Sequence, residues 1–151
     1  RLMGLKINLK PGEKIVVNGC IIANLDRRAT LEIENRADVL RADETLKTAD
    51  ANTPVLRLCH MLQIALVDAA SRPALVPQIR LSLSQLLDVL RRSCSVELAE
   101  VEALVEADDF YAAFRRLKPV IEHESRLLAH VVARKDQADL DSTLDDKENL
   151  E

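Results

Sequence analysis

Aromatic residues and glycine are scarce in this chain of 151 residues. It has no Trp, one Tyr and two Phe, and none of these lies in residues 1–50. Without aromatic side chains, this first third cannot form the stacking platform with which RRM-type domains bind bases. The chain also has only three glycines, which are too few for the glycine-rich phosphate loops of nucleotide-dependent enzymes.

Cysteines are few and long apolar runs are missing. Cys20, Cys59 and Cys94 are odd in number, widely separated and without CxxC spacing, which favours a reduced protein over a disulfide or zinc framework. We expect each cysteine to be a small core residue. No run of about 18 apolar residues occurs, and the first ten residues lack the apolar segment of a signal peptide. The sequence therefore predicts a cytoplasmic protein without a membrane segment.

Residues that could catalyse a reaction are not arranged for it. The three histidines include His123 and His130, whose separation of seven does not match the HExxH zinc motif. Acidic pairs such as Asp108 and Asp109 are more simply explained by the start of a helix. We therefore expect no enzymatic activity, no metal and no cofactor.

The formal net charge of −4 is unevenly distributed. Residues 135–151 contain seven acidic residues and two lysines, a net charge of 2 − 7 = −5. The rest of the chain is therefore close to neutral, which leaves room for local basic patches. Because residues 135–151 are polar, acidic and aperiodic, we expect them to form a disordered acidic tail.

The first part of the chain has the pattern of short strands. Leu5, Ile7 and Leu9 alternate with polar residues, as in a strand with one buried face. Pro11-Gly12 predicts a turn, and Asn18-Gly19 predicts a type I′ hairpin. Residues 4–42 accommodate four or five strands with short connections, hence an antiparallel sheet or small barrel. We call residues 3–48 the β module.

The pattern changes to helical spacing near residue 50. Thr53-Pro54 is a typical helix start, and apolar residues then recur at three-and-four spacing. We expect helices at about 54–70, 77–92 and 96–106, and a fourth that begins at residue 108 or 109 and is kinked near residues 115–116 by Pro119. Residues 53–134 therefore form a helical domain, and the predicted fold class is α+β.

Arginines in the loops and at the strand ends are the candidate binding residues. Such side chains could contact RNA phosphates and bases, although ordinary surface charge is the alternative interpretation. This candidate set is Arg27, Arg28, Arg36 and Arg41. A second basic cluster at the predicted kink has the solvated face of a helix as its alternative: Arg115, Arg116 and Lys118.

Four segments in order resemble the family of the flagellar regulator FlbT. These are "LKINLKPGEKIVVNGCIIAN", "RRATLEIEN", "VLRADE" and "DDFYAAFRRLKPVIEHESRLL", which together span about residues 4–130. The resemblance implies a post-transcriptional regulator of flagellin synthesis that associates with the 5′ untranslated leader of flagellin mRNA. It also implies a functional link to the small regulator FlaF.

The β module is also similar to the RNA-binding regulator CsrA. The similar pieces are "PGEKIVVNG" and "VLRADE". This resemblance implies strand pairing between two subunits of a homodimer. It further implies that an arginine at the end of the last strand, Arg41, reads the leader RNA.

Two hypotheses follow. The first is a non-enzymatic regulator, a repressor or an activator, that controls translation or decay of flagellin mRNA through its leader. The alternative is a flagellar chaperone or adaptor, because the apolar helix faces could leave a groove for FlaF, flagellin or a second copy of the chain. Ordinary intramolecular core is the simpler explanation for most of these apolar positions.

Overall fold

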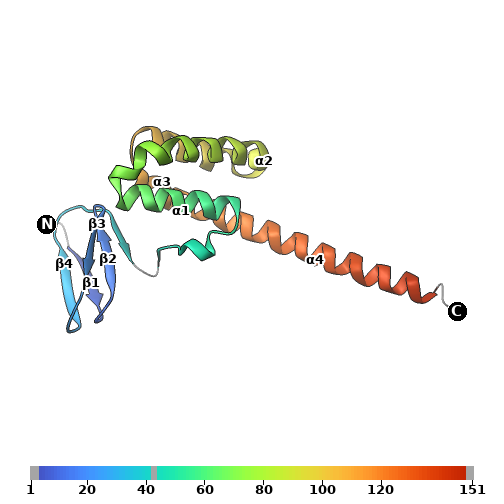
Figure 1. Cartoon of the computed structure of the whole chain (residues 1–151), viewed down its shortest axis with the longest axis horizontal. Helices are drawn as coiled ribbons and strands as arrows, with labels where there is room; N and C mark the ends of the chain where they lie inside the picture. The colour runs from blue at the N-terminus through green and yellow to red at the C-terminus, as the bar shows by residue number, and fades with distance from the viewer. Residues whose placement is uncertain (1–3, 42–43, 149–151) are drawn as a thin grey trace.

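The computed structural model of the chain describes residues 4–41 and 44–148. Five short strands come first and helices follow, as Figure 1 shows. The predicted α+β fold is therefore confirmed. Among the described helices, none is both long and apolar enough to cross a membrane.

The β module consists of five antiparallel strands in two small sheets. The strands are β1 (Leu5–Leu9), β2 (Lys14–Val17), β3 (Cys20–Ala23), β4 (Ala29–Ile33) and β5 (Val39–Arg41). One sheet pairs β1 with β4, and the other has the order β3-β2-β5. Asn18 and Gly19 between β2 and β3 both have positive φ, 49° and 79°, which confirms the predicted type I′ turn.

The two faces of the three-stranded sheet contact different cores. A small cluster inside the β module contains Ile7, Leu9, Ile15 and Val39. Val16 and Leu40, which point to the other face, belong to the main core together with the helices. The β module is thus packed onto the helices through its own strands.

Helix α1 (Pro54–Val67) begins where the sequence predicts, and two residues cap it. Thr53 Oγ1 accepts a hydrogen bond from the backbone N–H of Leu56 at 3.2 Å. Glu124, from the last helix, accepts hydrogen bonds from Thr53 Oγ1 and from the N–H of Val55. A carboxylate at a helix N-terminus is stabilising, so Glu124 ties the last helix to α1.

Helix α2 (Arg72–Glu106) reverses direction within its length. Leu90 and Cys94 have non-helical backbone angles. Arg80 and Glu106 form an ion pair at 2.7 Å although 26 residues separate them, whereas a straight helix would place them roughly 39 Å apart. The two halves therefore lie antiparallel, close to the second and third helices predicted from the sequence.

The expected fourth helix is interrupted at Leu117. Helix α3 (Phe110–Arg116) ends there and α4 (Lys118–Glu148) begins one residue later. Because Pro119 has no N–H, the carbonyl of Arg115 cannot receive the normal helical hydrogen bond. The break thus lies next to the predicted kink.

The structure differs from the expectation of a disordered acidic tail, because α4 continues to Glu148. No Pro or Gly follows Pro119 in the sequence, so nothing in this stretch stops a helix. Gln137 donates to Asp141 at 3.0 Å, and Thr143 donates to the carbonyl of Asp139 at 2.7 Å. The side-chain pair between Gln137 and Asp141 favours the helix locally, whereas the Thr143 hydroxyl only shares a carbonyl of its own helix.

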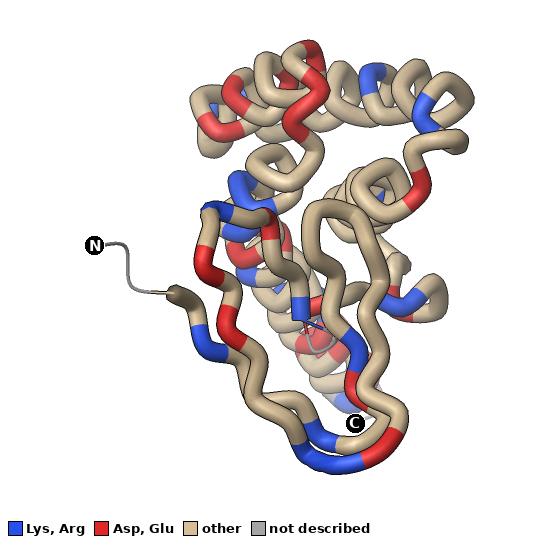
Figure 2. Tube along the Cα trace, turned by 90° about the vertical axis from the view of Figure 1, so that its left-hand side faces the viewer, with Lys and Arg blue, Asp and Glu red and all other residues tan. Residues whose placement is uncertain are grey.

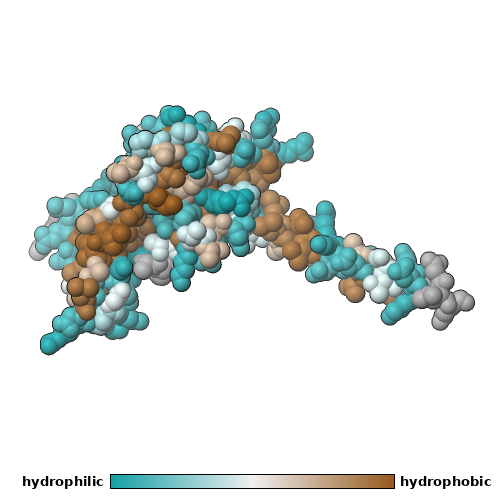
Figure 3. Space-filling view, in the orientation of Figure 1, coloured by the Kyte–Doolittle hydropathy of each residue, from teal (hydrophilic) through white to brown (hydrophobic). Residues whose placement is uncertain are grey.

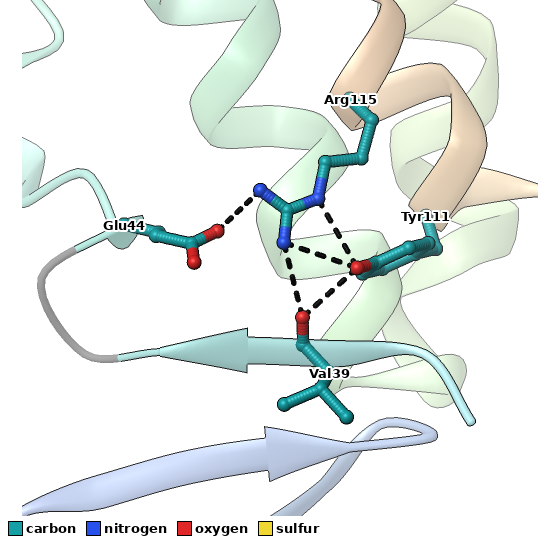
Figure 4. A network of polar contacts seen from close by, with 4 residues as sticks. All are labelled: Val39, Glu44, Tyr111 and Arg115. Atoms are coloured by element: carbon teal, nitrogen blue, oxygen red, sulfur yellow. Dashed lines mark hydrogen bonds and ion pairs between the residues drawn. The ribbon is translucent and has the colours of Figure 1, made fainter. Parts of the chain in front are cut away.

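A polar clamp joins α3 to the edge of β5 (Figure 4). Tyr111 donates a hydrogen bond to the carbonyl of Val39 at 2.9 Å, and Arg115 donates to the same carbonyl at 3.1 Å. Arg115 also donates to the Tyr111 hydroxyl and is ion-paired with Glu44. Partial burial lowers the pKa of Arg115, but the hydrogen bonds with Tyr111 and Glu44 outweigh it and raise the pKa above its ordinary value. The Arg115 guanidinium therefore stays charged, which maintains its contacts with Val39, Tyr111 and Glu44.

Loss of the Arg115 side chain from the clamp should destabilise the fold more than loss of the neighbouring Arg116 side chain. We expect Arg115→Ala to lower the free energy of unfolding by about 1–3 kcal/mol, because a charged hydrogen-bond partner of a part-buried carbonyl is lost. Arg116→Ala is the matched control, since it breaks only a solvated pair with Glu100, and exposed ion pairs of this kind contribute little to stability. Urea unfolding followed by circular dichroism measures both. Equal effects of the two substitutions would contradict the structural role of Arg115.

The three cysteines do not share one environment. Cys59 and Cys94 are buried, as expected, but Cys20 is exposed on β3, so the expectation of a core position is wrong for it. β3 is an edge strand with no element of the described chain over its outer side. Burial raises the pKa of Cys59 from 9.0 to about 11.

Alkylation should therefore distinguish the thiols. Iodoacetamide at pH 8 should modify Cys20 first, and should reach Cys59 only after unfolding, because the thiolate is the reactive form. Since the folded-state pKa of Cys59 is the higher one, its contribution to stability is full below pH 9 and is lost as the pH rises toward about 11. Peptide mass mapping gives the order of modification. Rapid labelling of Cys59 in the folded protein would contradict this.

Candidate nucleic-acid interface

Four cationic side chains line one hollow on the β module. Lys10 follows β1, Lys14 begins β2, Arg28 precedes β4 and Arg41 ends β5. The hollow has a volume of about 540 Å³ and is completed by Asn8, Leu9, Glu13 and Ile15. We call it the basic hollow.

The strand register brings these four residues together. Arg41 pairs with Ile15 in the β2–β5 ladder, next to Lys14. Leu9 pairs with Ala29 at the end of the β1–β4 ladder, so continuing that register by one step sets Lys10 opposite Arg28. Like charges opposite each other in a ladder are unfavourable, and a bound anion would relieve this repulsion.

Asn24 holds the two loops that border the basic hollow. Its side-chain amide donates to the carbonyl of Leu9 at 3.0 Å and to that of Arg27 at 2.7 Å. The backbone carbonyl of Asn24 accepts a hydrogen bond from the N–H of Gly12 at 2.7 Å. Gly12 has a positive φ of 81°, which favours glycine at this position. Asn24 therefore fixes the turn after β1 against the loop before β4.

The charges of the basic hollow are not neutralised by the protein. Lys10, Lys14, Arg28 and Arg41 are all exposed, and within the described residues none of them has a carboxylate within ion-pair distance. Glu13 is the one acidic residue among those that line the hollow. Figure 2 shows Lys and Arg segments gathered at the end of the β module that is farther from α2. Free cations around a concave surface are suited to bind phosphates.

The structure divides the first candidate set. Arg28 and Arg41 meet in the basic hollow, whereas Arg27 is exposed in the loop before β4 and is not among the residues that line it. Arg36 borders a different hollow of about 810 Å³ beside α3, which also contains the acidic residues Asp38, Asp108 and Asp109. Sequence reasoning missed Lys10 and Lys14, although they flank the Pro11-Gly12 turn, because only the arginines of the β module were considered.

The second basic cluster does not form one free patch. Arg115 belongs to the clamp on Val39, and Arg116 is ion-paired with Glu100, whose hydrogen bond raises the pKa of Arg116. Both also border the hollow that contains Arg36. Lys118 lines a third hollow with apolar residues such as Phe114 and Ile121. Of these three hollows among the described residues, the basic hollow therefore has the most unpaired positive charge.

Comparisons of the sequence with family models and with curated proteins find the same family. The family model described as "Flagellar protein FlbT" matches residues 5–128. A probable flagellum biosynthesis repressor protein FlbT of Caulobacter sp. (strain K31) is 32% identical over 130 residues, which cover 85% of this chain and 99% of the relative. The flagellum biosynthesis repressor protein FlbT of Caulobacter vibrioides (strain ATCC 19089 / CIP 103742 / CB 15) is 29% identical over 130 residues, covering 85% of this chain and 92% of the relative.

A third relative, from Mesorhizobium japonicum, is also named a probable flagellum biosynthesis repressor protein FlbT. It is 31% identical over 126 residues, which cover 82% of this chain and 84% of the relative. No solved structure matches the chain. The family match contains all four cations of the basic hollow and the complete clamp, and the chain belongs to the flagellar protein FlbT family.

Proposed function

We propose that this protein represses flagellum biosynthesis by binding the 5′ untranslated leader of flagellin mRNA in the basic hollow. The relatives' names support the repressor role. The observation that carries the RNA-binding part is the meeting of Lys10, Lys14, Arg28 and Arg41 around one concave surface without ion-pair partners. A leader held there would be withheld from translation or exposed to decay.

The chemistry of the basic hollow suits single-stranded RNA. The lysines act as point charges for phosphates, while the arginine planes can also hydrogen-bond to or stack on bases. The β module has no aromatic residue, so binding would depend on charge more than on stacking. Affinity should therefore fall steeply as salt is added.

Removing cations from the basic hollow should weaken RNA binding. We expect Lys14→Ala/Arg28→Ala/Arg41→Ala to reduce affinity for a labelled flagellin leader RNA by about tenfold or more and to reduce the salt slope by about 2, since each lost phosphate contact contributes about 0.7 for a single strand. Fluorescence anisotropy at several salt concentrations measures both. The matched control, Arg57→Ala/Arg91→Ala/Arg92→Ala, removes the same charge from exposed positions on α1 and α2 and should bind nearly as the unchanged protein does.

A scrambled RNA of equal length tests preference for the leader. Equal loss of affinity in the two triple variants would show that only net charge matters and would contradict a site in the basic hollow. Absence of any leader preference would favour the alternative, an adaptor whose helices bind FlaF or flagellin.

Asn24 provides a test that leaves the charge unchanged. Asn24→Ala removes the two hydrogen bonds that hold the loops around the basic hollow, so we expect RNA affinity to fall about threefold to tenfold while every cation remains. The salt slope should hardly change, because the number of phosphate contacts is retained. Anisotropy gives both values, and circular dichroism confirms that the variant is folded. An unchanged affinity would show that the loops need not be fixed.

A further inference from the structure

The basic hollow gathers its positive charge in one place. Its four cations lie at or next to the ends of β1, β2, β4 and β5 and surround a volume of about 540 Å³. This volume is within the range of roughly 300–1,000 Å³ for pockets that hold small molecules. A row of cations would suit the backbone of an RNA strand, because successive phosphates are separated by a nucleotide. Cations around one concave surface instead suit a ligand that carries several negative charges in one small group.

The charge of the basic hollow fits such a group. The residues that line it carry a net charge of 4 − 1 = +3, from the four cations and Glu13. A single phosphate inside an RNA strand would leave most of this charge unbalanced. In a 5′-triphosphate the two inner phosphates carry one negative charge each and the terminal one about −1.5 to −2 at pH 7, together roughly −3.5 to −4. A triphosphate therefore balances the hollow, whereas an internal phosphate does not.

Apolar walls and a neutral donor complete the basic hollow. Leu9 and Ile15 line it and are each only 2% exposed, and walls of low dielectric focus the field of nearby cations. Asn8 Oδ1 accepts a hydrogen bond from the Thr30 hydroxyl at 2.8 Å, so the Asn8 amide NH2 is left as a donor. Figure 3 shows hydrophilic side chains at the outer tip of the β module, away from the helices. Cations and an N–H donor together suit phosphate oxygens.

On the basis of the function proposed above, we propose that the basic hollow binds the triphosphate group at the 5′ end of the leader RNA. Lys10 and Arg28, beside the β1–β4 ladder, and Lys14 and Arg41, at the β2–β5 ladder, contact the phosphate oxygens. Asn8 donates a further hydrogen bond. The bound group also relieves the repulsion between the neighbouring cations.

A site for this group selects leaders by their end. RNA synthesis begins with a nucleoside triphosphate, so only an uncut leader carries the group, and a leader that has been cleaved no longer offers it. The base of the first nucleotide contributes little to the selection, because the β module has no aromatic residue on which it could stack. The protein would thus hold intact leaders and release cleaved ones.

Free nucleoside triphosphates carry the same group, but the leader has further phosphates beyond its first nucleotide. Arg27 is exposed in the loop next to Arg28 and lies outside the basic hollow. It is therefore placed to contact a phosphate of the following nucleotides, and each added phosphate contact strengthens binding. We expect the leader RNA to bind more tightly than a free nucleotide.

Three forms of one leader RNA test the proposal. They are labelled at the 3′ end and differ only at the 5′ end, which is a triphosphate, a monophosphate or a hydroxyl. Fluorescence anisotropy with the full chain, without Mg²⁺ so that the triphosphate keeps its full charge, measures their affinities. We expect the triphosphate form to bind about tenfold or more tightly than the hydroxyl form, because charge-assisted hydrogen bonds are gained, with the monophosphate form in between.

Variants of the basic hollow should change this preference in both directions. Lys14→Ala/Arg41→Ala should reduce it to about threefold or less. The matched control, Arg57→Ala/Arg92→Ala, removes the same charge from exposed positions on α1 and α2 and should keep the full preference. Glu13→Gln should strengthen binding of the triphosphate form by about twofold to fivefold, because it removes the one acid that lines the hollow. Circular dichroism confirms that each variant is folded.

Competition separates the two sources of the group. Unlabelled leader with a triphosphate end should displace the labelled RNA at a lower concentration than guanosine triphosphate does, and equal potency would assign the hollow to free nucleotides. Equal affinities of the three RNA forms would overturn the proposal. The function proposed above would survive that result if the triple variant of the basic hollow still weakened leader binding. Absence of binding by any form would overturn both.

Discussion

The carbonyl of Val39 is the point on which the arrangement of this protein depends. It lies on β5, an edge strand of the three-stranded sheet, where an open carbonyl would otherwise face solvent or another chain. Tyr111 and Arg115 of α3 both donate to it. One residue farther along, Leu40 is fully buried in the core formed by the helices. Together the polar clamp and the apolar contact fix the β module to the helical domain.

The same strand connects this junction to the candidate interface. Val39 and Arg41 lie on one face of β5 because side chains alternate. Val39 is buried in the small core of the β module, and Arg41 reaches the rim of the basic hollow. The opposite rim is held by Asn24, which joins the turn after β1 to the loop before β4. Lys14 and Arg41 are therefore carried by strand ends, and Lys10 and Arg28 lie next to strands in the two loops that Asn24 joins, so an RNA would meet the four cations already arranged.

Much of the fold follows from local patterns, and the rest depends on contacts between distant residues. Asn18-Gly19 specifies its turn through the positive φ that both positions require, and Thr53-Pro54 specifies a helix start. The closeness of Lys10 and Arg28 in the basic hollow depends on the register of β1 with β4, which single residues do not encode. Arg115 likewise looks like surface charge until α3 is placed beside β5. Polarity alone also predicted disorder for the acidic tail, although its local pairs are compatible with a helix.

The most direct test of the RNA-binding account is a titration of isotope-labelled protein with flagellin leader RNA, followed by NMR. Backbone amide signals and the arginine side-chain Nε–H signals report which residues meet the ligand. We predict the largest changes at Lys10, Lys14, Arg28 and Arg41 and in the turn around Gly12, with little change in α1 and α2. Changes concentrated on the helices, or no change at saturating RNA, would contradict the assignment of RNA binding to the basic hollow.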